Sequence, residues 1–327
     1  MKALITGGCG FIGSHLAEAL LARGDTVTVV DDLSTGRFVN VQHLVGQPGF
    51  SFAIETIANE PVMDRLVSEC DIIYHLAAAV GVELVVRDPV RVLETNVKGT
   101  DVILRVAARY RKKVILASTS EVYGKNTRVP FSEDDDSTLG PTTRSRWSYA
   151  CSKAMDEFMA LAFFKQQALP VVIVRFFNTV GPRQSGRYGM VIPRFVRQAL
   201  DNEPLTIYGD GRQSRCFGYV DDVVRAVIAL ADSPAALGQV YNIGSTEEVT
   251  IEALARRTMA LTGSQSQLVY IPYDQAYEEG FEDMQRRVPD IRKVQALVGW
   301  QPTVNLDGIL TRVIDAMRRE RLAGEPD

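Results

Sequence analysis

Short hydrophobic runs alternate with longer amphipathic segments along the first half of the chain. The runs are rich in β-branched residues and cover positions 3–6, 26–30, 72–76, 114–118 and 171–176. A segment long enough for a helix separates each run from the next, and the one at 14–21 carries apolar residues at helical spacing before Gly24. This alternation is typical of βαβ units. It predicts an α/β fold with a doubly wound parallel sheet, covered by helices on both faces.

The pattern changes after residue 178. Prolines and a turn signal then interrupt the chain, at Pro182, Pro193, Pro204, Pro234 and Gly209-Asp210-Gly211. We therefore expect residues 1–178 to form the main domain and residues 179–327 to form mainly a smaller C-terminal lobe. A strand near 240–243 is expected to return to the main sheet, and residues 306–322 are expected to form an amphipathic helix.

Composition narrows the class of protein. The 327 residues are 46% hydrophobic and 23% charged, as in ordinary globular proteins, and the net charge of −4 provides no general attraction for nucleic acid. The chain shows no leader before its first strand and no apolar run of the roughly 18 residues that a membrane span needs. Its cysteines lack metal-site spacing, at Cys9, Cys70, Cys151 and Cys216. We expect a cytoplasmic protein with reduced thiols, no metal, and no nucleic-acid or membrane partner.

A glycine-rich turn, Gly7-Gly8-Cys9-Gly10-Phe11-Ile12-Gly13, joins the first strand to the first helix. A backbone without Cβ atoms lets a pyrophosphate approach the helix N-terminus, where unpaired N–H groups attract negative charge. The second strand ends at Asp31, whose carboxylate can bind both hydroxyls of an adenosine ribose and would repel a 2′-phosphate. A glycine turn with a surface aspartate would look similar. In this βαβ setting, however, the pattern favours a Rossmann-like NAD site.

A possible catalytic pair follows. Tyr149 and Lys153 are four residues apart and therefore share one face of a helix. A tyrosine can act as a base when a lysine and an oxidised nicotinamide stabilise its phenolate. Thr119 ends a predicted strand, at the edge where parallel sheets bind ligands, and its hydroxyl could bond the oxygen that Tyr149 deprotonates. A tyrosine ring packed on a lysine side chain would explain the spacing equally well.

Several motifs together carry a resemblance to a known family. They are the glycine turn, Asp31, His75-Leu-Ala-Ala, Asn96, Ser118-Thr-Ser-Glu-Val-Tyr-Gly124, Tyr149-x-x-x-Lys153, Arg175-Phe-Phe-Asn178, Gly181-Pro-Arg183 and Gly299-Trp-Gln-Pro302. Over nearly its whole length the chain resembles an extended short-chain dehydrogenase/reductase of the NAD-dependent epimerase/dehydratase family, acting on a nucleotide sugar.

The resemblance implies roles for individual residues. NAD would take a hydride from the sugar, usually at C4, and later return it. The expected catalytic residues are Thr119, Glu121, Tyr149 and Lys153. The expected cofactor ligands are Gly7, Gly10, Phe11, Ile12, Gly13, Asp31, Leu76, Ala77, Tyr149 and Lys153. The expected ligands of the UDP-sugar are Arg146, Asn178, Tyr208, Arg215 and Arg287.

Two further features follow from the same resemblance. The acidic residue that often contacts adenine after the third strand is not evident in residues 52–57. A homodimer is expected through helices near 97–110 and 150–164, although their apolar stripes could equally face the core.

The reaction depends on residues near the sugar. A C4 ketone can lead to epimerisation, loss of water or loss of CO₂. Ser120-Glu121-Val-Tyr-Gly, Arg146-Trp-Ser-Tyr149 and Arg286-Arg287-Val-Pro-Asp290 resemble segments of UDP-glucuronate decarboxylases. Arg146 or Arg287 could bind the uronate carboxylate and Glu121 could handle the proton at C5, although Arg286-Arg287 could also be a solvated basic pair.

The alternatives remain open at the level of sequence. Ala79-Val80-Gly81 looks epimerase-like, so a UDP-glucose or UDP-glucuronate 4-epimerase is the main alternative to UDP-glucuronate decarboxylation. A 4,6-dehydratase is less favoured because Ser120 stands where those enzymes usually carry an aspartate. A non-catalytic NAD sensor would not need the intact set of Thr119, Tyr149 and Lys153.

Overall fold

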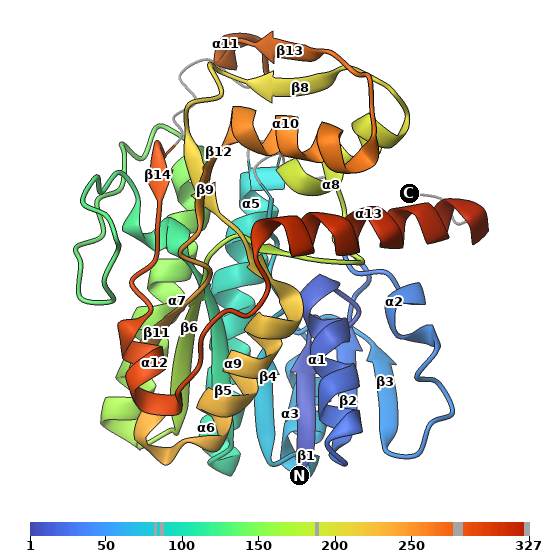
Figure 1. The fold of residues 1–327 in the computed structure, drawn as a ribbon. Coiled ribbons are helices and arrows are strands. Elements are labelled where there is room, and N and C mark those ends of the chain that lie inside the picture. The colour runs from blue at the N-terminus through green and yellow to red at the C-terminus, as the bar shows by residue number, and fades with distance from the viewer. Residues whose placement is uncertain (82–83, 86–87, 187–189, 277–283, 324–327) are drawn as a thin grey trace.

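A seven-stranded parallel sheet forms the centre of the molecule (Figure 1). The structure is a computed structural model, and it describes residues 1–81, 84–85, 88–186, 190–276 and 284–323. In the order β11-β6-β5-β4-β1-β2-β3 the strands are Gln239–Ile243, Val171–Phe176, Lys113–Thr119, Ile72–His75, Lys2–Thr6, Thr26–Asp31 and Phe50–Ile54. The predicted α/β fold with a doubly wound parallel sheet is confirmed.

Alternating side chains along the strands build a core on each face of the sheet. Leu4 of β1 packs into one cluster with Met63 and Ile103, whereas its neighbour Ile5 packs into the other with Leu16 and Val224. The first face is covered by α3 (Glu60–Glu69), α6 (Gly99–Tyr110) and α7 (Arg146–Gln167), and the second by α1 (Phe11–Ala22), α9 (Val220–Asp232) and α12 (Arg292–Val298). Burial on both faces explains why these strands are hydrophobic without a polar alternation.

Short elements connect this framework. They are α2 (Val39–Gln42), α5 (Pro89–Leu93), the π-helix η1 (Glu94–Lys98), the 3₁₀ helices η2 (Ser120–Tyr123) and η3 (Pro234–Ala236), and the paired strands β7 (Thr179–Val180) and β10 (Gly218–Tyr219). Of these, η2 directly extends the C-terminal end of β5 and therefore lies at the edge where the sheet meets the second lobe.

The second lobe lies over the carboxyl ends of the sheet strands, at the top of Figure 1. Its elements are α8 (Val191–Leu200), β8 (Leu205–Tyr208), β9 (Ser214–Cys216), β12 (Glu248–Thr250), α10 (Ile251–Thr262), β13 (Leu268–Ile271), α11 (Tyr273–Ala276), β14 (Arg286–Arg287) and α13 (Leu306–Ala323). Between them the chain returns to the sheet, where β11 pairs with β6 from Gln239 opposite Val172 to Ile243 opposite Phe176. Within the described part of the chain, no helix has the length and apolarity that crossing a membrane requires.

Candidate active site

The sheet order reverses beside β1, and a cleft opens at this point towards the second lobe. Ligands of open α/β sheets bind at such a switch point. The cleft has a volume of about 480 Å³, within the usual range for small-molecule sites. Every residue predicted from the sequence to bind cofactor or substrate, or to act in catalysis, lines it: Gly7, Gly10, Phe11, Ile12, Gly13, Asp31, Leu76, Ala77, Thr119, Glu121, Arg146, Tyr149, Lys153, Asn178, Tyr208, Arg215 and Arg287.

The glycine turn leaves room for a phosphate group. Gly7 has a φ of +70°, and a Cβ there would lie 2.7 Å from the backbone nitrogen of Ala77. A Cβ at Gly13 would lie 2.4 Å from the carbonyl oxygen of Gly7, so both positions require glycine. Gly10 is different, because its Cβ would meet only the Gly7 carbonyl, at 3.0 Å. No side chain caps α1, so its first N–H groups can receive a pyrophosphate, and the turn fits a dinucleotide.

Asp31 lies at the ribose end of the same half of the cleft. Its carboxylate is buried and accepts hydrogen bonds from the backbone N–H groups of Cys9 (3.0 Å) and Leu33 (2.9 Å). Burial raises the pKa of Asp31, and the two backbone donors oppose that rise. Asp32 is exposed and accepts from the N–H of Ser34, which is a turn contact. The geometry therefore places the buried carboxylate, and not its neighbour, where a ribose diol can be bound.

Sequence reasoning missed the residues that follow the third strand. Glu55, Thr56 and Ile57 line the cleft directly after β3. These residues could have been predicted from their position at the carboxyl end of a strand, since that is where such sheets bind ligands. Glu55 is held in place by the side-chain amide of Asn59, at 2.9 Å.

Tyr149 and Thr119 meet where α7 crosses the end of β5. The Thr119 hydroxyl is hydrogen-bonded to the Tyr149 phenol and also accepts from the backbone N–H of Glu121 (3.2 Å). Burial raises the pKa of Tyr149 above its ordinary value. The charges of Glu121 and Asp156 raise it further, whereas the Thr119 hydrogen bond and the Arg146 charge oppose this.

Lys153 has an acidic partner that the sequence did not indicate. Its Nζ donates to the Asp156 carboxylate at 2.7 Å, and both side chains are buried. Burial raises the pKa of Asp156, and the lysine charge opposes that rise. Lys153 is therefore paired with Asp156, and the negative charge of Asp156 in turn raises the pKa of Tyr149. The Tyr-Lys spacing alone thus does not describe the electrostatics of the phenol.

A buried polar network fixes α7 against the sheet. Arg175 donates to both carboxylate oxygens of Glu157 on α7, at 2.9 and 2.7 Å, and to the Tyr123 hydroxyl at 2.9 Å. Glu157 also accepts from Ser118, and Tyr123 donates to Asn242 at 2.7 Å. Because Ser118 precedes Thr119 and Glu157 follows Lys153 by one helical turn, this network sets the position of the catalytic strand relative to the catalytic helix.

Glu121 lies among arginines in the cleft, two residues after Thr119. It is ion-paired with Arg146, and its other carboxylate oxygen lies 3.4 Å from Arg287. Burial disfavours its charge, but Arg146, Arg287 and Arg215 outweigh burial and lower its pKa to about 2. Glu121 is therefore a carboxylate at neutral pH, held between cations.

Strand pairing brings two of these arginines together. β14 runs parallel to β9, with Arg287 opposite Arg215. Side chains alternate along a strand, so the preceding residue, Arg286, points away and forms an exposed ion pair with Glu248, at 2.7 Å. The expectation of a solvated basic pair thus describes Arg286 alone, whereas Arg287 is buried in the cleft.

The remaining predicted substrate ligands lie along the second lobe. The Asn178 amide donates to the Cys216 carbonyl at 2.9 Å, which ties β7 to β9. Tyr208 carries the Arg194 guanidinium 4.1 Å above its ring. Arg194 and Gln213 also line the cleft, although sequence reasoning did not select them. Over the described residues, no cluster of three or more His, Cys, Asp or Glu side chains is placed to hold a metal ion.

Comparison with known proteins extends over nearly the whole chain. A family model described as GDP-mannose 4,6 dehydratase matches residues 4–313. The UDP-N-acetyl-alpha-D-glucosaminuronate decarboxylase of Bacillus cytotoxicus is 44% identical over 97% of this chain and 98% of that protein. The UDP-glucuronic acid decarboxylase 1 of Xenopus tropicalis is 39% identical over 98% of this chain and 72% of that protein.

Solved structures agree on the fold. A UDP-glucuronic acid 4-epimerase from Bacillus cereus, in complex with UDP-glucuronic acid and NAD, superposes with a TM-score of 0.88. It is 30% identical and covers 98% of this chain and 99% of its own. A UDP-glucose 4-epimerase from Thermotoga maritima, solved with UDP-glucose, gives the same TM-score at 32% identity, over 98% of this chain and 100% of its own. The NAD in the first of these structures agrees with the cofactor predicted from the glycine turn and Asp31.

Proposed function

The chain belongs to the family described as GDP-mannose 4,6 dehydratase, as its motifs predicted, and on that premise we propose that it is an NAD-dependent decarboxylase of a UDP-linked hexuronic acid. The observation that carries this proposal is the group formed by Glu121, Arg146, Arg215 and Arg287 in the cleft that also holds Tyr149. Three guanidinium groups surround one carboxylate. The surplus of positive charge suits the C6 carboxylate of a hexuronic acid.

The chemistry begins at C4 of the sugar. NAD⁺, when bound, supplies the acceptor for the C4 hydride and later returns it. Tyr149 takes the proton from the C4 hydroxyl, while the Thr119 hydroxyl holds that oxygen in place. Because burial disfavours the Tyr149 phenolate, its formation needs a nearby cation, and Arg146 is a cation whose charge opposes the rise in pKa.

The second step uses the arginines. With a ketone at C4, the sugar is a β-keto acid, and its C5–C6 bond can break with release of CO₂. The electron pair of that bond forms an enolate, which is then protonated at C5. Glu121 has a pKa of about 2, so it enters the reaction as an anion that holds Arg146 and Arg287 in position. In our proposal the proton that C5 takes up comes from water, and Glu121 can pass it on only after accepting it.

Two uronic acids fit this scheme. One decarboxylase relative is named for UDP-N-acetyl-glucosaminuronic acid and another for UDP-glucuronic acid, and both compounds carry the C6 carboxylate. We take UDP-glucuronate, predicted from the sequence, and its 2-acetamido analogue as the two substrates to test.

The deciding experiment follows CO₂ and sugar products together. Purified protein is incubated with UDP-glucuronate, UDP-N-acetylglucosaminuronate or UDP-glucose. The sugar products are separated by chromatography and identified by mass spectrometry. We expect CO₂ from at least one uronate and no reaction with UDP-glucose. If a uronate yields only its C4 epimer and no CO₂, the protein is a 4-epimerase and the proposed decarboxylation is wrong.

The epimerase alternative has specific support. A solved relative of the same fold is a UDP-glucuronic acid 4-epimerase, so binding a uronate does not by itself select CO₂ loss. Val80, in the epimerase-like Ala79-Val80-Gly81 segment, also lines the cleft. Dehydration has weaker support, because Ser120 provides no carboxylic acid to expel the C6 hydroxyl.

The two parts of the chain are assigned to the two ligands. We propose that residues 1–178, together with β11, bind NAD, and that residues 179–327 mainly bind the UDP moiety. The glycine turn and Asp31 support the first assignment, and Tyr208, Asn178 and Arg215 support the second.

We propose a homodimer through α7, which contains the helix expected at 150–164, and through α5. The other expected helix, near 97–110, is α6, and its apolar residues Val102, Ile103, Leu104, Val106 and Ala107 are buried in the core instead. Val90 on α5 and Phe158 on α7 are 65% and 72% exposed, and Met155 beside Phe158 is 47% exposed. Large apolar side chains in such numbers on neighbouring helices are typical of an interface. Light scattering of wild type and Phe158→Glu tests this, and a wild-type monomer would refute it.

Residence in the cytoplasm is proposed from thiol chemistry. Cys9, Cys70, Cys151 and Cys216 are all free, and reduced thiols suit a reducing compartment.

A further inference from the structure

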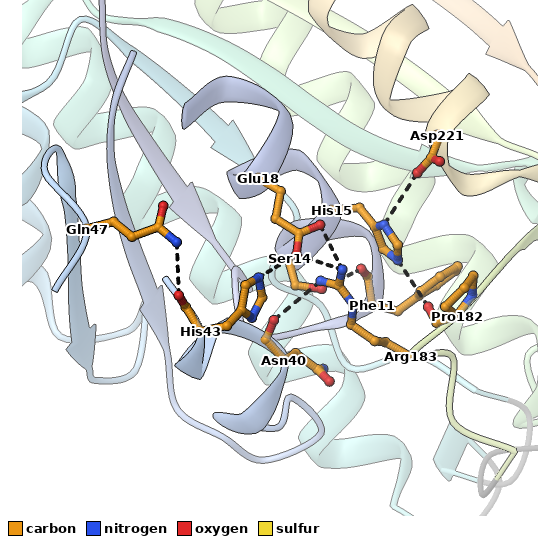
Figure 2. A network of polar contacts seen from close by, with 10 residues as sticks. All are labelled: Phe11, Ser14, His15, Glu18, Asn40, His43, Gln47, Pro182, Arg183 and Asp221. Carbon is orange, nitrogen blue, oxygen red and sulfur yellow. Dashed lines mark hydrogen bonds and ion pairs between the residues drawn. The ribbon is translucent and has the colours of Figure 1, made fainter. Parts of the chain in front are cut away.

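A polar network outside the catalytic centre joins α1 to residues 181–184 (Figure 2). Arg183 donates to both carboxylate oxygens of Glu18, at 2.8 and 2.7 Å, and Glu18 lies on α1. The same guanidinium donates to the backbone carbonyl of Asn40 in α2, at 3.3 Å. Arg183 therefore connects three segments that are far apart in the sequence.

A second bridge lies one helical turn away. His15 on α1 contacts the carbonyl oxygen of Pro182 through Nε2, at 3.1 Å, and the Asp221 carboxylate through Nδ1, at 3.4 Å. His15 is buried, and its ring packs edge-on against Phe11. Since 15 and 18 share a face of the helix, two successive residues of the loop, Pro182 and Arg183, are attached to the same face of α1.

The network borders the half of the cleft that fits the dinucleotide. Phe11, Asn40 and Arg183 all line this cleft. The Asn40 amide donates to the carbonyl oxygen of Cys9, at 2.8 Å, inside the glycine turn. The loop at 181–184 is thus linked to the pyrophosphate-binding turn both through α1 and through α2.

The backbone of this loop also needs outside support. Arg183 has a φ of +69°, a left-handed conformation that residues other than glycine seldom adopt. Such a conformation persists where tertiary contacts hold it. Here the contacts are the charge-assisted hydrogen bonds from Nη2 of Arg183 to both carboxylate oxygens of Glu18, together with the bond from Nη1 to the Asn40 carbonyl.

We propose that Glu18 and Arg183 form a clamp that retains NAD in the cleft. The ion pair holds residues 181–184 to α1 at the border of the pyrophosphate site, so it slows the departure of the dinucleotide. An enzyme that returns the hydride to its product reuses its NAD in place, and slow release suits that chemistry. The inference rests on the proposed use of NAD and is independent of which sugar reacts.

The test compares two ion pairs on the same helix. Glu18→Gln removes the charge that holds Arg183 and that also contacts His43 Nε2, at 2.5 Å. Asp232→Asn removes one of the two carboxylate partners of Arg23, which follows α1 and contacts Asp232 on α9 at 2.7 Å and Asp25 at 2.6 Å. Neither Arg23 nor Asp232 lines the cleft. NADH is bound to each variant and displaced by excess NAD⁺ in a stopped-flow fluorimeter, and thermal unfolding is recorded in parallel. We expect NADH release to be about tenfold faster for Glu18→Gln, which corresponds to about 1.4 kcal/mol, and unchanged for Asp232→Asn.

A third variant distinguishes the effect of the Arg183 side chain from the effect of its backbone conformation. Arg183→Gly removes the guanidinium but suits the positive φ, so the fold is retained and faster release is again expected. Wild-type release rates in both Glu18→Gln and Arg183→Gly would overturn the clamp. Tighter NADH binding in Glu18→Gln would also overturn it, because Arg183 would then act on the phosphates directly and Glu18 would only compete. A wild-type protein that binds no NAD would refute the proposed function itself.

Discussion

Replacing Glu121 by glutamine tests the proposed carboxylate site most directly. The change keeps the shape of the side chain but leaves Arg146 and Arg287 without their anion. The pKa of Glu121 falls from 4.5 to about 2, which corresponds to on the order of 3 kcal/mol of net attraction to its surroundings. Because the folded-state pKa is lowered, this stabilisation is complete above about pH 4.5 and is lost as the pH falls through about 2. At neutral pH, we expect the variant to lose on the order of 3 kcal/mol of unfolding free energy.

Thermal unfolding of wild type and variant measures this loss. For a chain of 327 residues it corresponds to a decrease in Tm of about 4 °C. Glu248→Gln provides a matched control, since Glu248 also has a pKa of about 2 and pairs with an arginine of β14, but at an exposed position. Solvent screening limits such a pair to about 1 kcal/mol or less, so the control should change little.

Thermal unfolding with added ligand then shows whether these arginines bind a substrate carboxylate or only form a structural ion pair with Glu121. A UDP-hexuronate brings its own carboxylate to the arginines, so it should raise the Tm of Glu121→Gln more than it raises that of wild type. UDP-glucose lacks the carboxylate and should raise both equally. The reasoning would be refuted by a variant as stable as wild type, or by equal rescue with the two sugars.

Three further changes test the rest of the site. Tyr149→Phe should reduce turnover by at least about a hundredfold while leaving NAD bound, because it removes the proton acceptor and little volume; rate assays and the bound NAD content check both halves. Asp31→Ala should lose most of the preference for NAD over NADP, measured as the ratio of the two dissociation constants. Asp156→Asn should move the acidic limb of the rate profile to lower pH. Removing this negative charge lowers the pKa of Tyr149, and it also removes the charged partner of Lys153. An unchanged limb in the pH dependence of C4 oxidation would contradict this role.

Local features of the fold could be predicted because they depend on nearby residues. The run at 26–30 is β2, Thr26–Asp31, and the run at 171–176 is β6, Val171–Phe176. Both strands are buried, so their β-branched composition shows directly in the sequence. The glycine turn is local in part. Gly13 is required by the carbonyl of Gly7 in the same turn, whereas Gly7 is required by Ala77, which follows β4 and is distant in the sequence.

The electrostatics of the site depend on distant residues and could not be predicted in this way. Arg215 and Arg287 become neighbours only because β14 pairs with β9. The sequence alone does not show that Arg287 points into the cleft while Arg286 pairs with Glu248 outside it. Asp156 is a similar case, because the sequence does not show that this carboxylate is completely buried and paired with Lys153.

The position of the charges gives decarboxylation a direction. The substrate carboxylate would enter beside Glu121, an anion whose lowered pKa keeps it charged, so the arginines are shared between two carboxylates. Loss of CO₂ would move this second negative charge away from the arginines and towards the C4 oxygen. Arg146 and Arg287 attract the carboxylate before it leaves, so they can select a uronic acid and orient its C5–C6 bond, but their charge alone does not favour cleavage of that bond. The choice between CO₂ loss and epimerisation therefore depends on how well the groups near Thr119 and Tyr149 stabilise the negative charge that develops on the C4 oxygen.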